Sequence, residues 1–184
     1  MDTLEPQLID LCQQLGVELR ARGWRMASAE SCTGGLIAAT CTGLSGASDW
    51  FECGFVCYSN AAKSAHLGVS PALIEQHGAV SEPVVRALAE GALWHSLAQV
   101  SVAVSGIAGP LGGSPSKPVG TVCLGWASPA GVRSQTLHFE GDRAAVRAAA
   151  MAVARAASSA KCVAGARCCT TCSRLSLPRS LVLP

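Results

Sequence analysis

The sequence predicts an α/β fold, a three-layer α/β/α sandwich built on a mixed sheet. Helical patterns alternate with short apolar strands through the first two thirds of the chain, an order that covers both faces of a sheet with helices. Apolar stretches over 121–127 and 132–139 are joined by Ser-Pro-Ala-Gly, a hairpin signal that makes this end of the sheet antiparallel. With 184 residues, 49% of them hydrophobic, the chain can bury a core without metal or disulfide staples.

The first elements flank a short motif that ends in two glycines. Leucines at steps of four and three over 4–19 predict an amphipathic helix, which stops near Gly23. A strand is expected over 24–27 and a helix over 36–42. The motif Ala-Glu-Ser-Cys-Thr-Gly-Gly, at 29–35, therefore lies on a strand-to-helix turn.

The middle of the chain predicts one strand and three helices. The strand is expected over 51–58, and Ser59 caps a short helix that contains Lys63. A second short helix is expected over 71–77. A long helix follows over 81–97, opened by a serine with a glutamate and a proline in its first turn.

Three loops are expected to meet at one edge of the sheet. A strand over 100–104 leads into a segment too rich in glycine and proline for regular structure, and Asp142 caps a final helix that runs to about residue 157. In α/β sheets, ligands bind beyond the carboxyl ends of the strands. That rule selects the loops 28–35, 58–63 and 105–118.

Charge and cysteine content divide the chain into a body and a tail. Residues 1–158 are expected to form one domain, and residues 159–184 a divergent, poorly ordered tail rich in cysteine and arginine. Residues 1–160 have 10 basic and 12 acidic side chains, a net charge of −2, which indicates no binding to nucleic acid. No segment predicts a membrane span or an export signal, so we expect a cytoplasmic protein, and the apolar composition favours a homo-oligomer.

Ser31 is the first candidate for chemistry, because it sits where a strand turns into a helix. Free N–H groups at a helix start can stabilise an oxyanion, and a nucleophile placed there gains them from its own turn. Two alternatives stay open. Ser31 or Thr33 can merely cap the helix, and the neighbouring thiol of Cys32 can itself be the nucleophile.

Lys63 is the candidate base, because none of the four histidines lies in the three selected loops. It follows Tyr58, the one tyrosine of the chain, by five residues. A lysine withdrawn from water can lose its proton near neutral pH and accept one from a hydroxyl. The alternative is an ordinary solvated lysine on a helix surface.

Arg143 and Gly106 are candidates for substrate binding. Arg143 lies in the first turn of the last helix, where the helix dipole opposes a cation, so an external anion such as a phosphate is expected there. An ion pair with Asp142 or Glu140 is the alternative, and the sequence does not divide a phosphate role between Arg143 and Arg147. Gly106 allows close backbone approach to a ligand.

Six motifs together resemble the bacterial, competence-damage-inducible CinA C-terminal domain family, over about residues 5–157. They are Ala-Glu-Ser-Cys-Thr-Gly-Gly (29–35), Tyr-Ser-Asn-Ala-Ala-Lys (58–63), His-Gly-Ala-Val-Ser-Glu (77–82), Ser-Gly-Ile-Ala-Gly-Pro (105–110), Lys-Pro-Val-Gly (117–120) and Gly-Asp-Arg (141–143). The resemblance implies an amidohydrolase that converts nicotinamide mononucleotide to nicotinic acid mononucleotide and ammonia in pyridine nucleotide salvage. It implies no metal and no cofactor.

The same resemblance assigns roles residue by residue. It makes Ser31 the nucleophile and Lys63 the base, with Tyr58 and Ser105 positioning the pair. The oxyanion is assigned to the turn of Thr33, Gly34 and Gly35, and the substrate phosphate to Arg143. A nucleotide-binding or regulatory module that has kept the pocket but lost turnover is the alternative function.

Overall fold

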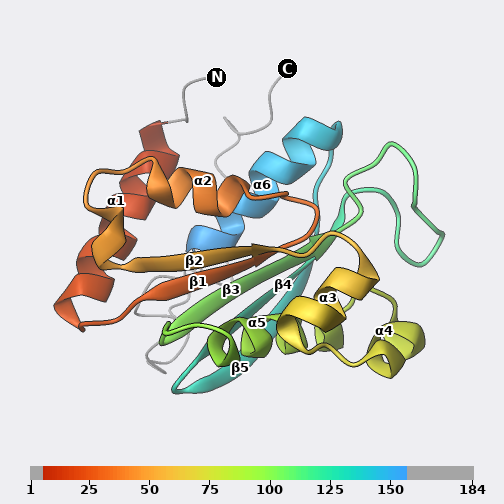
Figure 1. Ribbon diagram of the computed structural model, residues 1–184. Coiled ribbons are helices and arrows are strands. Elements are labelled where there is room, and N and C mark those ends of the chain that lie inside the picture. The colour runs from red at the N-terminus through yellow and green to blue at the C-terminus, as the bar shows by residue number, and fades with distance from the viewer. Residues whose placement is uncertain (1–5, 157–184) are drawn as a thin grey trace.

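The computed structural model describes residues 6–156, which form a five-stranded sheet with helices on both faces (Figure 1). The helices and strands are α1 (Pro6–Ala21), β1 (Met26–Glu30), α2 (Leu36–Thr42), the 3-10 turn η1 (Ala47–Asp49), β2 (Phe51–Val56), α3 (Asn60–Leu67), α4 (Pro71–His77), α5 (Glu82–Trp94), β3 (Val100–Gly106), β4 (Thr121–Ser128), β5 (Gly131–His138) and α6 (Arg143–Ala156).

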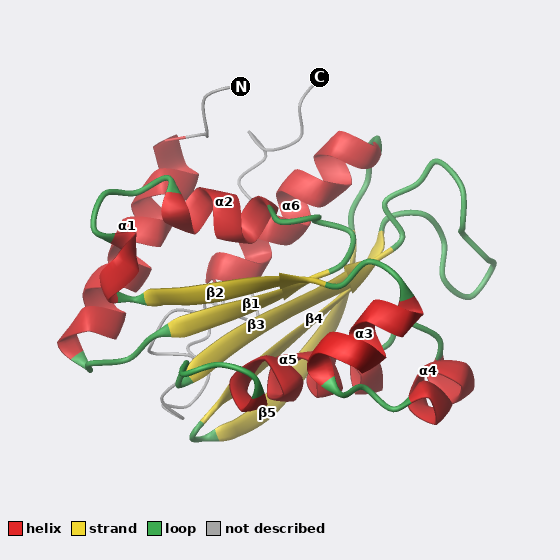
Figure 2. Cartoon of the chain, in the orientation of Figure 1, coloured by secondary structure: helices red, strands yellow, loops and turns green. Residues whose placement is uncertain are grey.

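The sheet is mixed, with strand order β2-β1-β3-β4-β5. β2, β1 and β3 run parallel, whereas β4 and β5 pair antiparallel beside them. Helices α1, α2 and α6 lie on one face and α3, α4 and α5 on the other (Figure 2). The predicted α/β/α sandwich with a mixed sheet is confirmed.

Each face of the sheet has its own apolar core. The predicted leucine stripe of α1 is confirmed over its described side chains, because Leu15 and Leu19 are buried with Trp50 and the apolar side of α6. On the other face, Val84 and Leu88 of α5 pack against the small residues of the central strands. The two cores hold the sheet between its helices. They therefore also hold in place the loops that follow the carboxyl ends of the parallel strands.

The first strand was predicted too early, at 24–27 instead of Met26–Glu30. All five residues of β1 are buried, because helices cover both faces of the sheet at this central strand. A fully buried strand shows no alternation of polar and apolar residues, and Glu30 reads as a polar stop. The first residues of the 29–35 motif therefore belong to the strand.

Several other boundaries differ slightly from the predictions. β2 ends at Val56, β3 continues to Gly106, and α5 ends at Trp94, three residues before the predicted end. The caps of two helices are confirmed: Ser59 Oγ accepts from Ala62 N at 3.0 Å, and Asp142 Oδ1 accepts from Ala145 N at 2.9 Å. The η1 turn was not predicted.

The predicted domain end at 158 and the tail expected over 159–184 lie outside the described residues. Within residues 6–156, no helix combines the length and the apolar character that crossing a membrane requires.

Candidate active site

A cavity of about 210 Å³ opens at the carboxyl ends of the parallel strands. All three loops that the sequence selected contribute to it, as the rule for α/β sheets predicts. Its lining comprises Ser31, Cys32, Tyr58, Asn60, Lys63, Ala79, Val80, Ser105, Gly106, Ala108 and Arg143. Six of the nine predicted site residues therefore meet in one cavity.

Ser31 and Lys63 are in direct contact at the floor of this cavity. Lys63 Nζ lies 3.2 Å from Ser31 Oγ, although the two residues are 32 positions apart in the chain. β1 delivers Ser31, whose backbone N–H donates to Val104 O at 3.0 Å, and α3 delivers Lys63 in its first turn. The contact joins a hydroxyl to an amine at a distance suited to proton transfer.

Lys63 is buried, not a solvated surface lysine, with 1% of its surface exposed. Burial disfavours the ammonium form and lowers the pKa of Lys63, while the nearby thiols of Cys57 and Cys32 act weakly in the opposite direction. A base of this kind holds less of its proton near neutral pH than an ordinary lysine does.

Tyr58 contributes its backbone as well as its side chain. Its carbonyl oxygen accepts from Lys63 Nζ at 3.0 Å, while its phenol oxygen accepts from Arg143 Nη2 at 3.2 Å. The sequence did not distinguish these two roles. The Lys63 amine therefore has two fixed partners, the Tyr58 carbonyl oxygen and the Ser31 hydroxyl.

The thiol of Cys32 lines the cavity beside Ser31 but is held in its protonated form. Burial raises its pKa to about 11, although the backbone N–H groups of Cys32 and Thr33 and the charges of Arg147 and Arg143 lower it. Because the thiolate is the nucleophilic form, this environment disfavours Cys32 as the attacking group at neutral pH.

The turn after Ser31 is closed by Glu30, not by a hydroxyl cap. The Thr33 hydroxyl and the Gly35 N–H both donate to Glu30 Oε2, at 2.8 and 3.0 Å, and Gly34 N–H donates to Ser31 O at 3.1 Å. The sequence assigned an oxyanion to these three residues. Their Gly34 and Gly35 N–H groups and the Thr33 hydroxyl already have partners inside the turn, and none of the three residues lines the cavity.

Arg143 lies at the cavity mouth without the ion pair that was considered for it. Its Nη1 donates to Gly109 O at 2.9 Å and its Nη2 to the Tyr58 phenol oxygen. The Asp142 carboxylate is used instead to cap α6. The guanidinium charge is therefore not neutralised by its neighbour, which suits the binding of an anion.

Arg147 lies one turn further along α6. Its Nη2 donates to Thr33 O at 2.9 Å, so it supports the turn that follows Ser31. Within residues 6–156, its Nε is the buried side-chain nitrogen or oxygen that lacks a hydrogen-bond partner.

Part of the cavity wall comes from a strap, residues 77–80, of which Ala79 and Val80 line the cavity. The backbone oxygens of the strap are all bound by side chains. Lys117 Nζ donates to His77 O at 2.9 Å and to Val80 O at 2.7 Å. Ser105 Oγ donates to Ala79 O at 2.8 Å, so its hydroxyl contacts the wall and not the Ser31–Lys63 pair. The Gly78 oxygen accepts from Ser81 Oγ at 2.8 Å. Sequence reasoning gave Lys117 no role.

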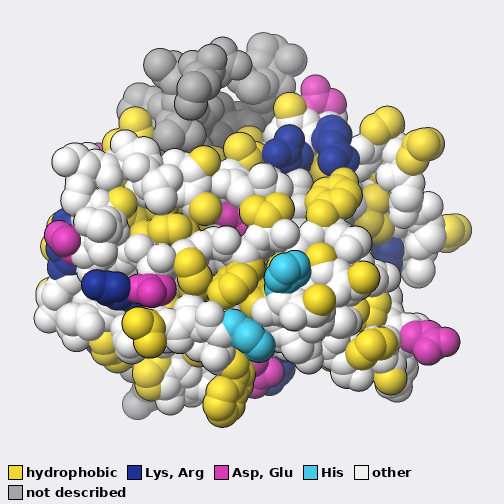
Figure 3. Space-filling model, viewed as in Figure 1, with side chains coloured by type: hydrophobic (Ala, Val, Ile, Leu, Met, Phe, Trp, Pro, Cys, Tyr) yellow, Lys and Arg dark blue, Asp and Glu magenta, His cyan; other side chains and the backbone are white. Residues whose placement is uncertain are grey.

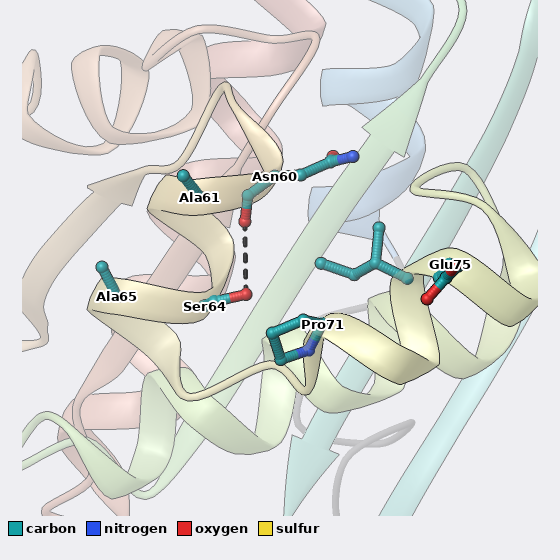
Figure 4. A pocket seen from close by; sticks show the side chains of 7 residues that line it. Asn60, Ala61, Ser64, Ala65, Pro71 and Glu75 are labelled. Atoms are coloured by element: carbon teal, nitrogen blue, oxygen red, sulfur yellow. Dashed lines mark hydrogen bonds between the residues drawn. The ribbon is translucent and has the colours of Figure 1, made fainter.

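Charged side chains lie near the cavity, and a second, wider depression lies beside it. Figure 3 shows basic side chains gathered over the start of α6, with an acidic side chain and hydrophobic ones beside them. A groove lies between α3 and α4, as Figure 4 shows from close by. Its volume is about 650 Å³, and it shares Asn60 with the cavity. Its other lining residues are Ala61, Ser64, Ala65, Pro71, Ile74 and Glu75. It contains neither Ser31 nor Lys63.

Known proteins match both the sequence and the fold. The nicotinamide-nucleotide amidohydrolase PncC of Enterobacter agglomerans is 54% identical over 144 residues, which cover 78% of this chain and 88% of that protein. A CinA-like protein of Syntrophobacter fumaroxidans is 52% identical over 136 residues, but the chain spans only 32% of its length. The crystal structure of the competence/damage inducible protein CihA from Agrobacterium tumefaciens superposes with a TM-score of 0.81 at 38% identity, covering 84% of this chain and 95% of that one.

A family model, the CinA C-terminal domain, matches residues 9–160. This range includes all eleven residues that line the cavity and every element of the sandwich except the first residues of α1. The chain belongs to the CinA C-terminal domain family.

Proposed function

We propose that this protein hydrolyses the carboxamide of nicotinamide mononucleotide, giving nicotinic acid mononucleotide and ammonia in pyridine nucleotide salvage. One observation supports this most directly: the buried contact of 3.2 Å between Lys63 Nζ and Ser31 Oγ in a cavity that also contains Arg143. A relative that shares 54% of the aligned residues is named for amide hydrolysis of a nicotinamide nucleotide.

In the first step, Ser31 Oγ attacks the carboxamide carbon while its proton passes to the neutral amine of Lys63. The carbon–nitrogen bond then breaks, and the departing nitrogen takes the proton from Lys63 and leaves as ammonia. An ester of Ser31 with the nicotinoyl group remains. Water, deprotonated by the same amine, cleaves this ester and restores the serine hydroxyl.

The substrate itself helps to keep the base neutral. The pyridinium ring of nicotinamide mononucleotide has a positive charge, and a cation near Lys63 disfavours the ammonium form. Burial of Lys63 acts in the same direction. Both effects increase the fraction of amine that can accept the serine proton.

We assign the oxyanion to the first N–H group after the nucleophile, that of Cys32, a residue that lines the cavity. This N–H lies outside the set of donors that Glu30 occupies. A donor from the residue that follows the nucleophile is the arrangement found at nucleophile elbows. The turn of Thr33, Gly34 and Gly35, to which the resemblance assigned the oxyanion, does not line the cavity.

We assign the substrate phosphate to Arg143, with Gly106 and Ser105 shaping the opposite side of the cavity. The Arg143 guanidinium lines the cavity, 3.2 Å from the Tyr58 phenol, and among the described residues no carboxylate forms an ion pair with it. A phosphate would replace the Gly109 oxygen or the phenol as its acceptor. Cytoplasmic location and self-association stay predictions from the sequence.

An ammonia assay on purified protein tests this proposal. Nicotinamide mononucleotide should release ammonia, whereas free nicotinamide, which lacks the phosphate, should release far less. If the alternative binding module is correct, nicotinamide mononucleotide will raise the melting temperature without any ammonia being formed.

A further inference from the structure

Glu30 occupies an unusual position for a carboxylate. It is the last residue of β1, directly before Ser31, and only 1% of its surface is exposed. A buried carboxylate is costly unless hydrogen bonds replace the water that it has lost. The way in which this carboxylate is satisfied therefore indicates what it does.

Five donors converge on the two oxygens of Glu30. One is a hydroxyl of β1, and the other four are a hydroxyl and N–H groups of the turn and of the start of α2. Oε1 accepts from Ser28 Oγ at 3.0 Å and from Ala38 N at 2.9 Å. Oε2 accepts from Thr33 Oγ1 at 2.8 Å and from Gly35 N and Ile37 N at 3.0 Å each. All five donors are neutral, so the dipole at the start of α2 provides the positive potential that stabilises the carboxylate.

The carboxylate thereby fixes the loop that presents the nucleophile. Ser31 lies between Glu30 and the donors of Thr33 and Gly35, so the chain must leave β1, present Ser31 to the cavity and return to the same carboxylate within five residues. Gly34 and Gly35 make this possible with φ values of 61° and 97°, in the left-handed region. The hydroxyl of Ser31 has little freedom to move while these bonds hold.

The backbone of Glu30 also fixes the segment that leads to the base. Glu30 O accepts from Cys57 N at 2.8 Å, at the point where the chain leaves β2. Tyr58 follows directly, and its carbonyl oxygen holds Lys63 Nζ at 3.0 Å. One residue thus anchors the Ser31 turn through its side chain and the approach to Lys63 through its main chain.

We propose that Glu30 is the positioning residue of the active site, whose buried carboxylate holds Ser31 Oγ within reach of Lys63 Nζ. This inference rests on Ser31 being the nucleophile of the proposed function, but not on which amide is the substrate. Glu30 does not touch the reacting atoms. It acts through the geometry of the turn.

The test is the rate at which a fluorophosphonate labels Ser31, followed by intact-protein mass spectrometry. In this reaction the Ser31 oxygen forms a bond to phosphorus, fluoride leaves, and the hydroxyl proton passes to Lys63. The variants are Glu30→Gln, which places an amide N–H₂ against the turn donors, and Ser31→Ala, which should abolish labelling. Glu52→Gln is the matched control, because this carboxylate pairs with Arg25 at 2.6 Å on β2, outside the cavity.

Glu30→Gln should label at least tenfold more slowly than the unmodified protein at a temperature where circular dichroism shows it folded, and Glu52→Gln should label at the unmodified rate. The dependence of the Glu30→Gln rate on pH should keep the unmodified midpoint, because the lysine is unchanged. In turnover, kcat should fall with little change in KM. Labelling of folded Glu30→Gln at the unmodified rate would overturn the proposal.

Thr33→Val is the second variant, in case Glu30→Gln does not fold. It removes one donor to Oε2 and keeps the side-chain shape. We expect labelling to slow about threefold or more, and an unchanged rate would also overturn the proposal. If the unmodified protein labels but releases no ammonia from nicotinamide mononucleotide, the proposed substrate is wrong and the positioning role of Glu30 stands.

Discussion

The amine of Lys63 and the hydroxyl of Ser31 lie 3.2 Å apart in the lining of the cavity. The carbonyl oxygen of Tyr58 accepts a hydrogen bond from the same amine and so fixes it from a second direction. This arrangement unites two properties that a serine nucleophile needs. The base is close enough to take the proton, and its withdrawal from water lowers its pKa.

Removing either member of the pair should abolish turnover. Positioned acid–base catalysis contributes roughly 10²–10⁴-fold to a rate, so Lys63→Ala should reduce kcat for nicotinamide mononucleotide by about that factor. Ser31→Ala should reduce it at least as far. Ammonia release measured on folded variants checks both.

Cys32→Ala is the control for these two variants. Its raised pKa, about 11, keeps the thiol protonated, so its sulfur is not needed for attack, and ammonia release should stay within about threefold of the unmodified rate. Inactivation by iodoacetamide together with full activity of Ser31→Ala would show instead that the cysteine is the nucleophile.

The activity should rise with pH and then level off. Lys63 accepts the serine proton only as the neutral amine, and burial lowers its pKa below the ordinary value of 10.5. The rate should therefore increase through that lowered pKa and become constant above it. A profile of kcat/KM against pH measures this midpoint, and a midpoint at or above 10.5 would contradict the role of burial.

The stability of the protein should show the same titration with a defined sign. Between the lowered pKa of Lys63 in the folded state and 10.5 in the unfolded chain, the unfolded state binds more protons, so the free energy of unfolding rises with pH. Lys63→Met removes this dependence. Urea unfolding of both proteins at several pH values checks it: the difference between them, unmodified minus variant, should increase as pH rises through this interval.

The convergence of the site was predictable because it depends on topology. Parallel strands end at one edge, so a motif after β1 and a lysine after β2 had to meet there once the fold class was known. The buried state of Lys63 was not predictable in the same way. The local sequence around it equally describes a solvated helix, and burial results from Tyr58, Ser31 and the strap coming together only in the folded chain.

The contacts that sequence reasoning missed are those that join distant segments. Glu30 reads as a polar interruption of a strand, because the helix dipole and N–H groups that stabilise it exist only after α2 has formed. Lys117 reaches His77 across 40 positions, with no spacing pattern to indicate it. Its place in the selected loop 105–118 and its place in the Lys-Pro-Val-Gly motif were the available signals.

Arg143→Ala should weaken substrate binding more than it slows chemistry. A hydrogen bond to a charged group contributes about 1.5–3 kcal/mol, so KM for nicotinamide mononucleotide should rise roughly 10- to 150-fold. The riboside of nicotinamide lacks the phosphate, and its hydrolysis should be little affected. Comparing kcat/KM for the two substrates checks the assignment. Equal losses for both would show that Arg143 acts through Tyr58 and not on a phosphate.

Lys117→Met should loosen the wall of the cavity. The ammonium of Lys117 bonds two partly buried carbonyl oxygens of the 77–80 strap, and leaving them without a partner costs at most about 1–3 kcal/mol, the range for fully buried groups. We expect a lower melting temperature and a higher KM, because Ala79 and Val80 line the cavity on this strap. Ser116→Ala, on the exposed part of the same loop, should change stability by less than about 0.5 kcal/mol. Thermal unfolding and KM measured on both variants decide the matter, and an unaltered KM in a destabilised Lys117→Met would confine this lysine to a role in folding.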